Sequence, residues 1–450
     1  MIELLLFGSF FVFLLLGVPV AFSLGASAVV VLLTTDGLQV LDVVPGVMFP
    51  SLSSGTLLAI PFFVLAGAVM QHTGISQRLV DLAYMLFGRF SFGLAAVTIV
   101  AAFFFSAISG SGPATVAAIG AILIPALVRN GYKREHATSL VAASGSMGIV
   151  VPPSIAFIIF AVVAAEYQRV SISRLFIAGI VPGVLMAVAF FVAAMMVPRV
   201  RQVAVATVRG RAQSEGTPSI LDDEHRASAK DIGLAFVRAI PGLLIPVIIM
   251  GGIYGGIFTP TEAGAVASVY ALVVGLLVYR DLPLKRLPAV MLEAGVSTAT
   301  IMFIVGLASL FSYVITVEGV ASRVSEAVLS VTDNRVIVLL IAVVILLVVG
   351  AFVDAVSAFY LFVPILVPVL LAVGVDITTI GVFMTVALAI GLFTPPVGLN
   401  LFVATGISGA RLSETIRGVV PFLLAAIVVL LLITFVPALS NGLPDLLGVQ

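Results

Sequence analysis

The sequence predicts an all-α polytopic membrane protein built from two inverted-topology repeats that contain helical hairpins and broken helices. The first observation behind this prediction is composition: the chain is 62% hydrophobic and 9% charged, whereas a soluble domain carries roughly 25% charged residues. The second is a series of twelve charge-free runs of 17 or more residues, since a bilayer core needs about 20 apolar residues per helix. The third is a set of proline and glycine landmarks that recurs at a fixed spacing.

Several classes of function are excluded by what the sequence lacks. Formal net charge is zero, so nothing indicates nucleic-acid binding, and the absence of cysteine rules out disulfides and thiol catalysis. No G-x-x-x-x-G-K-[ST], H-E-x-x-H or G-x-S-x-G motif occurs, so we expect no enzyme. The start, Met1 to Glu3, has no basic residue, so the first apolar run is expected to be a membrane span rather than a cleaved signal.

One long polar stretch, residues 199–238, divides the chain. It carries seven Lys and Arg residues, and such residues are retained on the cytoplasmic side of a membrane. We therefore expect a charged cytoplasmic linker at 199–238, between an N-terminal membrane half at 1–198 and a C-terminal membrane half at 239–450.

The two halves share landmarks. The pairs Pro152-Pro153 and Pro395-Pro396 lie 243 residues apart. The same spacing separates three further pairs, namely Gly148 and Gly391, Pro125 and Pro368, and Gly131 and Gly374. Upstream, "TGISQRLVD" (73–81) resembles "EGVASRVSE" (318–326) at an offset of 245. A fixed spacing over several landmarks indicates an internal structural repeat.

Loop charges predict how the repeats are oriented. The loop "RNGYKREH" (129–136) carries three Lys and Arg residues, whereas its counterpart "AVGVDITT" (372–379) carries none. The positive-inside rule places the first loop in the cytoplasm and the second on the opposite side. This is inverted topology, which is typical of transporters that alternate access between the two sides of the membrane.

The helical pattern is interrupted at matching places in both halves. Ser109–Pro113 breaks a charge-free run whose two ends, Arg89 and Arg129, are basic, so the run is expected to fold back as a hairpin. The expected segments, in order, are a hairpin at about 90–128, a broken helix at about 137–165, a second hairpin at about 336–371 and a second broken helix at about 378–407. Irregular backbone inside a membrane is tolerated only where it is buried in protein or lines a polar cavity, so the four breaks predict a transport site.

The residues at the breaks suit an alkali cation. Serine hydroxyls and freed carbonyls are hard oxygen ligands, and each proline removes an amide donor and frees a carbonyl upstream. A broken helix also presents a positive N-terminus to an anionic substrate. The alternative is that small residues only allow helices to pack closely.

Two acidic residues lie beside breaks. Asp354 separates two apolar runs and is either a ligand, a proton relay or substrate gate, or a helix cap. Glu262, in "GIFTPTEAG" (256–264), is expected to support a helix cap made by Thr259 or Thr261.

Several blocks resemble the large membrane subunit of TRAP transporters, the tripartite ATP-independent periplasmic family. They are "PFFVLAGAVM", "SGSGPATVAAIGAILIPALVRNGY", "GIVVPPS", "GIFTPTEAG" and "GLFTPPVGLNLFVA", and the likeness runs nearly end to end. The resemblance implies a DctM-like, sodium-driven importer of organic acids such as C4-dicarboxylates or sialic acid, in a bacterial or archaeal cytoplasmic (inner) membrane. It implies an elevator fold, a periplasmic substrate-binding protein and a small four-helix membrane subunit, which is expected to be separate because four more helices do not fit this length.

The resemblance also implies site residues. One sodium ion would be held by five residues of the N-terminal half, Ser106, Ser109, Gly148, Val151 and Pro153. A second would be held by four residues of the C-terminal half, Gly350, Gly391, Thr394 and Val397. The substrate would lie between them, near Ser111, Asp354 and Asn400. No cofactor other than sodium as the coupling ion is expected.

Three other classes of function are alternatives to a secondary active importer. A passive channel needs a continuous polar lining, and this chain shows local breaks with apolar flanks. A membrane enzyme needs a nucleophile and a base, and the motifs for them are missing. A stand-alone sodium- or proton-coupled anion transporter or exchanger of a related inverted-repeat fold stays open as an alternative.

Overall fold

The computed structural model describes residues 2–35, 37–88, 90, 92–196 and 229–449, and within these ranges it is built of helices without a β-strand. Among the described residues, seven helices are long and apolar enough to cross a membrane. An eighth span is possible if α4 (Ala59–His72) and α5 (Ile75–Phe87), bent by 68° at their junction, count together. The prediction of an all-α polytopic membrane protein is therefore confirmed.

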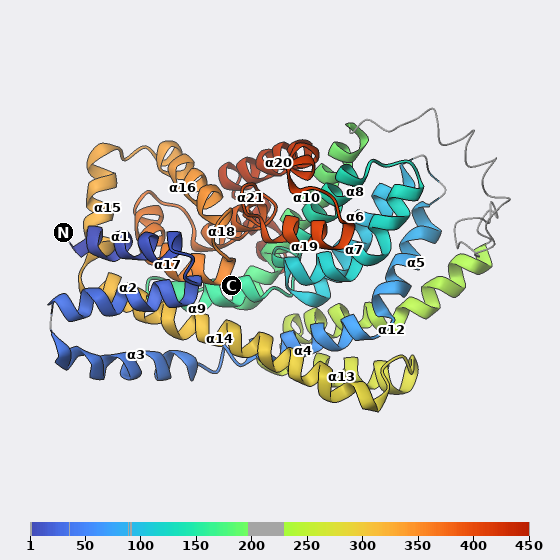
Figure 1. Cartoon of the computed structure of the whole chain (residues 1–450), viewed down its shortest axis with the longest axis horizontal. Coiled ribbons are helices and arrows are strands. Elements are labelled where there is room, and N and C mark those ends of the chain that lie inside the picture. The colour runs from blue at the N-terminus through green and yellow to red at the C-terminus, as the bar shows by residue number, and fades with distance from the viewer. Residues whose placement is uncertain (1, 36, 89, 91, 197–228, 450) are drawn as a thin grey trace.

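Three N-terminal helices form one end of the molecule (Figure 1): α1 (Ile2–Leu15), α2 (Val20–Thr35) and α3 (Val43–Leu52). They pack against α14 (Leu287–Val317), the longest described helix. Aromatic side chains fill part of this contact, with the rings of Phe10 and Phe311 lying 6.1 Å apart edge to face. Such pairs prefer this geometry because the positive edge of one ring meets the negative face of the other.

The first hairpin consists of α6 (Gly93–Ser109) and α7 (Gly112–Arg129). Only Gly110 and Ser111 lie outside helix, so the break is shorter than the predicted Ser109–Pro113. Gly110 has φ 61°, a left-handed conformation that glycine adopts without steric cost. Pro113 lies in the first turn of α7, where its missing N–H would have had no helical partner.

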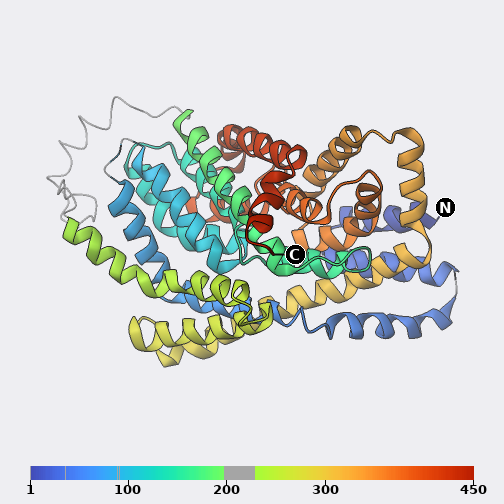
Figure 2. The same cartoon turned by 180° about the vertical axis from the view of Figure 1, so that it is seen from behind.

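The second hairpin consists of α16 (Arg335–Gly350) and α17 (Ala355–Ala372). Its tip is four residues long, from Ala351 to Asp354. Figures 1 and 2 show α18 between the two hairpins, so the hairpins approach the middle of the molecule from opposite sides.

Two helices are broken at the proline pairs. In the first half, α8 (Arg134–Gly145) leads into the short 3-10 helix η2 (Ser146–Ile149), and α9 (Ile155–Ala164) follows the break. In the second half, α18 (Ile377–Gly391) and α19 (Leu399–Ser408) flank the break. Both Pro-Pro bonds are cis.

The remaining helices complete a bundle around the breaks: α10 (Ile172–Met196), α12 (Ala229–Tyr254), α13 (Pro260–Val273), α15 (Val320–Val331), α20 (Leu412–Phe435) and α21 (Ala438–Leu446). Helix begins at Ala229, so the last ten residues of the expected linker at 199–238 belong to the start of α12. The rest of that linker lies outside the described residues.

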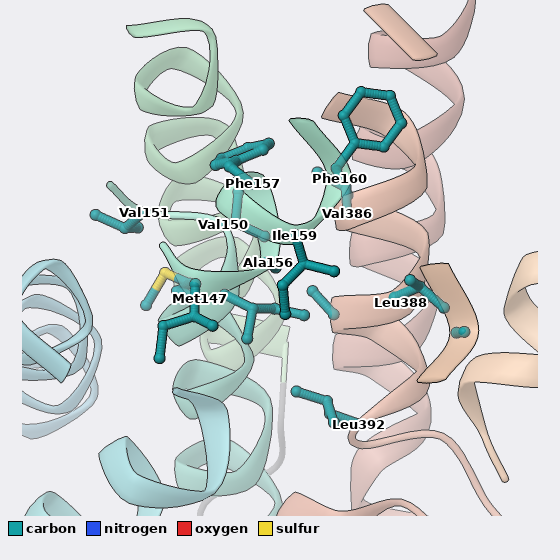
Figure 3. Packing of buried hydrophobic residues seen from close by; sticks show 14 of the residues in the cluster. Met147, Val150, Val151, Ala156, Phe157, Ile159, Phe160, Val386, Leu388 and Leu392 are labelled. Carbon is teal, nitrogen blue, oxygen red and sulfur yellow. The ribbon is translucent and has the colours of Figure 1, made fainter. Parts of the chain in front are cut away.

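The core joins the two halves. Figure 3 shows Met147, Phe157 and Phe160 of the first broken helix beside Val386 and Leu388 of α18, and all five are at most 1% exposed. Lipid tails are as apolar as these side chains, so close van der Waals packing stabilises this contact inside a bilayer. The breaks are therefore held in a rigid centre.

Candidate functional site

The first hairpin tip lies directly against the first break. A Cβ atom on Gly148 would lie 2.5 Å from the carbonyl oxygen of Ser111, and one on Gly110 would lie 3.3 Å from that of Pro153. No side chain fits at Gly148 without moving backbone. The structure therefore brings four predicted positions into one group, Ser109, Ser111, Gly148 and Pro153.

Hydroxyl groups form hydrogen bonds within the first hairpin tip. The hydroxyls of Ser109 and Thr115 lie 2.9 Å apart, and Thr115 Oγ1 donates to the Ser111 carbonyl over 2.8 Å. Sequence reasoning missed Thr115, although its position four residues after Ser111 puts it one helical turn away. Ser106 Oγ is fully buried and has no hydrogen-bond partner among the described residues, which is costly unless another group binds there.

The proline pair removes the helical hydrogen-bond partners of two carbonyls at the first break. A continuous helix would bond the carbonyls of Gly148 and Ile149 to the amides of residues 152 and 153, but both of these are prolines. Ser154 Oγ compensates at Ile149 with a bond of 2.6 Å. The Val151 amide donates to the Met147 carbonyl over 2.8 Å and so does not serve Gly148.

The second hairpin tip meets the second break in the same manner. A Cβ on Gly391 would clash with the backbone of Gly350. The Gly398 amide donates to the Ala351 carbonyl over 3.4 Å. Thr394 Oγ1 donates to the Ile390 carbonyl over 2.7 Å, which leaves its lone pairs available to a cation. Val397, the fourth predicted residue, is partly buried in the same loop.

Asp354 is the N-cap of α17. One carboxylate oxygen accepts the amides of Val356 and Ser357 at 3.0 and 3.1 Å, and the other accepts Ser357 Oγ at 2.6 Å. Of the roles left open by the sequence, the structure shows the helix cap. The predicted helix cap supported by Glu262 is also present. Of the two threonines expected to make it, Thr259 is the cap, since Thr259 and Glu262 each accept the other's backbone amide.

Asn400 connects the two halves at the centre. Its side-chain amide donates to the Ala142 carbonyl of α8 over 3.1 Å, while Oδ1 is buried without a hydrogen-bond partner among the described residues. A Cβ on Gly112 would lie 3.1 Å from that Oδ1, so the first hairpin tip also reaches Asn400. An unpaired buried amide oxygen is rare in native proteins and marks this position as a binding candidate.

Two cavities lie away from this centre. One of about 520 Å³ lies among α5, the first hairpin and α12, and one of about 550 Å³ lies among α3, α14, α9 and α17. None of the predicted sodium or substrate residues lines either cavity.

Two hairpin tips that meet two broken helices inside an apolar bundle define the class of multi-pass secondary transporters, in which irregular helices form the binding site. The family model described as "Tripartite ATP-independent periplasmic transporter, DctM component" matches residues 7–439. The chain therefore belongs to this family, and the resemblance drawn from the sequence is confirmed.

Relatives are similar over most of the chain. The C4-dicarboxylate TRAP transporter large permease protein DctM of Pseudomonas aeruginosa is 40% identical, over 90% of this chain and 89% of that protein. The protein of the same name from Rhodobacter capsulatus is 35% identical over the full length of both. The isethionate TRAP transporter permease protein DctMQ of Oleidesulfovibrio alaskensis is 39% identical over 96% of this chain, which spans 65% of that longer relative.

A solved structure shares the fold. The YdaH transporter of Alcanivorax borkumensis superposes with a TM-score of 0.61 over 91% of this chain and 90% of that one, at 16% identity. This likeness concerns the fold alone. Family membership and the apolar helices together show a multi-pass protein of the bacterial inner membrane that acts in secondary transport of organic acids. Its relatives are transporter permeases, and the family implies a small membrane subunit and a periplasmic binding protein as partners.

Proposed function

We propose that this protein is the sodium-coupled membrane importer of a small organic acid, which it receives from a periplasmic binding protein. The observation that carries the proposal is the pair of contacts between hairpin tips and broken helices. At each contact the proline pair removes the helical amides that two carbonyls would otherwise bind, and those of Ile149, Gly391 and Leu392 accept other donors through one of their two lone pairs. Sodium binding at both contacts would couple the ion gradient to movement of the substrate.

The donor set fits sodium. It consists of hydroxyl and carbonyl oxygens, which suit a hard cation, and it contains the unpartnered Ser106 Oγ. The close approach at Gly148 and at Gly391 puts backbone from two segments within reach of one ion. The first ion would be held by Ser106, Ser109, Gly148, Val151 and Pro153, and the second by Gly350, Gly391, Thr394 and Val397.

The substrate is proposed to bind between the two ions. Ser111 begins α7 and Asn400 lies in the first turn of α19, so the positive ends of two helices face this region and favour an anionic group. The relatives are named for C4-dicarboxylate, isethionate and sialic acid transport. We assign Ser111 and Asn400 to substrate contact and Asp354 to positioning the second tip next to it.

The proposed assembly has three components. The chain would work with a four-helix membrane subunit and with the binding protein, which selects the substrate and delivers it from the periplasm. Movement of the hairpins and broken helices as one body, an elevator, would then expose the site to each side in turn.

The test is uptake into proteoliposomes that contain the chain and both partners. With an inward sodium gradient, uptake of a C4-dicarboxylate is expected; with potassium in place of sodium, it should cease. Ser109→Ala and Thr394→Val should each raise the sodium concentration at half-maximal uptake by about tenfold, since each removes one oxygen ligand worth about 1.4 kcal/mol.

Thr434→Val is the matched control, because Thr434 is fully buried and makes the same bond to a carbonyl four residues earlier, Leu430, at 2.7 Å. It should leave the sodium titration unchanged. Equal uptake without any sodium gradient would disprove sodium coupling, and unchanged titrations in both site variants would disprove the site assignment.

A further inference from the structure

Thr115 lies one helical turn beyond the first hairpin tip, and its hydroxyl connects the two arms of that hairpin. The side chain is fully buried, and Oγ1 donates to the Ser111 carbonyl over 2.8 Å. Threonines in helices commonly bond to the carbonyl four residues earlier, but Thr115 Oγ1 also lies 2.9 Å from the hydroxyl oxygen of Ser109. This second contact joins the start of α7 to the end of α6 across the tip.

The lone pairs of the Ser111 carbonyl decide which hydroxyl donates in that contact. The carbonyl has two lone pairs, and it accepts the Thr115 amide over 3.1 Å and Thr115 Oγ1 over 2.8 Å. Thr115 has one hydroxyl hydrogen, which is used in this bond, so its Oγ1 accepts from Ser109. Ser109 is therefore the donor, since the Ser111 carbonyl, 3.2 Å from Ser109 Oγ, has no lone pair left for it.

This direction determines what Ser109 offers to a cation. A hydroxyl binds a cation through a lone pair, so its hydrogen must point elsewhere. When the hydrogen of Ser109 lies on Thr115, Ser109 Oγ accepts the Ser111 amide over 3.4 Å through one lone pair. The other lone pair is available to an ion. Of Ser109 Oγ and the Ser111 carbonyl oxygen, only the hydroxyl oxygen can therefore serve as a ligand.

The second hairpin tip is built differently. At the repeat spacing of 243 residues, Asp354 corresponds to Ser111 and Ala358 corresponds to Thr115. Asp354 caps α17 with its side chain, whereas Ser111 makes no capping bond with its own. The second tip has no hydroxyl in the place of Thr115, so a substitution of Thr115 concerns the first contact only.

We propose that Thr115 is a positioning residue for the first sodium ion and that it acts through Ser109 rather than as a ligand. Thr115 Oγ1 accepts the hydrogen of Ser109 and so keeps a lone pair of Ser109 directed at the ion. This inference rests on the proposed sodium coupling and on Ser109 as a ligand. It requires that the hydroxyl of Thr115 affects sodium binding only while Ser109 carries its own hydroxyl.

Sodium titrations of uptake into proteoliposomes, with the chain and both partners present, test this inference. Thr115→Val has nearly the same shape without the hydroxyl, and it should raise the sodium concentration at half-maximal uptake by about fivefold, the worth of one neutral hydrogen bond. Uptake at saturating sodium should stay within about twofold, because only binding of the ion is weakened. Thr115→Ser keeps the hydroxyl and should give the titration of the unaltered chain.

A double variant tests the route through Ser109. Ser109→Ala alone is expected to raise the half-maximal sodium concentration by about tenfold, and the double variant with Thr115→Val should raise it by the same factor, whereas independent effects would multiply to about fiftyfold. Thr98→Val is the matched control. Thr98 is fully buried in the same hairpin and donates to the carbonyl of Leu94, four residues earlier, over 2.8 Å, so its loss should leave the titration unchanged.

Four results would overturn the inference. They are an unchanged titration in Thr115→Val, the same shift in Thr115→Ser, factors that multiply in the double variant, and loss of uptake by Thr115→Val at saturating sodium. Failure of the proposed sodium coupling would look different, because uptake by the unaltered chain would then not depend on sodium at all.

Discussion

Glycine residues at the two breaks cannot be replaced by another residue without moving the backbone. Glycine has a hydrogen atom where other residues carry a Cβ, so two stretches of backbone can come into contact there. At Gly148 the neighbour is the Ser111 carbonyl, and at Gly391 it is the main chain of Gly350. A methyl group at either position would push a hairpin tip away from the break that it contacts. The side chains nearby, such as Ser109 and Thr394, refine a geometry that the glycines make possible.

Gly391→Ala is expected to lower the free energy of unfolding by about 1–3 kcal/mol, the usual cost of overpacking, and to abolish uptake. Gly406→Ala, in α19, is the control because a Cβ there meets no atom within 4 Å. It should leave both properties nearly unchanged. Thermal unfolding in detergent and proteoliposome uptake measure the two effects. An active Gly391→Ala protein would contradict the close approach.

At the scale of the helices, side-chain capping determines where each arm of the second hairpin begins. Asn334 caps α16 and Asp354 caps α17 through side-chain oxygens that accept backbone amides. The first amides of a helix have no partner within it, and inside a bilayer no water can replace the cap. The cap at Asp354 therefore holds the second tip in position.

Two substitutions of Asp354 distinguish its role as a helix cap from a role of its negative charge in transport. Asn caps helices as well as Asp does, so Asp354→Asn should keep both stability and uptake within about twofold of the unaltered protein. Asp354→Ala should lose about 0.5–2 kcal/mol of stability and most uptake. A stable Asp354→Asn protein without uptake would show instead that the negative charge acts in transport.

Polar contacts attach the C-terminal helix α21 to the bundle: Asn441 of α21 donates to Asp376 and to Thr379 of α18, each over 3.1 Å, and Arg174 makes a second set. Arg174, in the first turn of α10, donates to Asp445 over 2.7 Å, to the Val449 carbonyl over 2.5 Å and to Thr378 over 3.0 Å. Its side chain is only 17% exposed, so its loss would leave partners unsatisfied.

Arg174→Ala is expected to speed amide hydrogen exchange in α21 by about tenfold or more, because local opening then costs less. Arg411→Ala should not, since Arg411 is 83% exposed and 3.9 Å from its partner Glu414. Exchange in α20 serves as the internal reference. Unchanged protection of α21 in Arg174→Ala would mean that apolar packing and the hydrogen bonds of Asn441 hold it without the arginine.

For the molecule as a whole, the sequence predicted the repeat but not how its parts meet. The charge-free runs and the spacing of the proline pairs were sufficient to predict the class of protein, the hairpins and the breaks. Both signals are local, because lipid requires apolar side chains in each span and proline alters the backbone of its immediate neighbours. The contact between Asn400 and Ala142 depends on packing between segments 258 residues apart. Spacing along a single chain carries no record of such contacts.

The inverted orientation is a prediction about the whole molecule that labelling can test. The chain has no cysteine, so single cysteines can be introduced at two exposed positions, Lys133 after α7 and Ala372 at the end of α17. A membrane-impermeant maleimide should modify Ala372→Cys in intact cells and Lys133→Cys only after the membrane is opened. Labelling of both from the same side would contradict inversion.

The proline pairs and glycines at the breaks also affect how such a protein diversifies. Main-chain oxygens are present whatever amino acid occupies a position, so mutation there alters shape without replacing the donor atoms. In the proposed mechanism, substitutions of side chains such as Ser111 or Asn400 would therefore change the substrate, while the main-chain oxygens proposed to bind sodium would stay the same. Changing the ion would require a different path of the polypeptide itself.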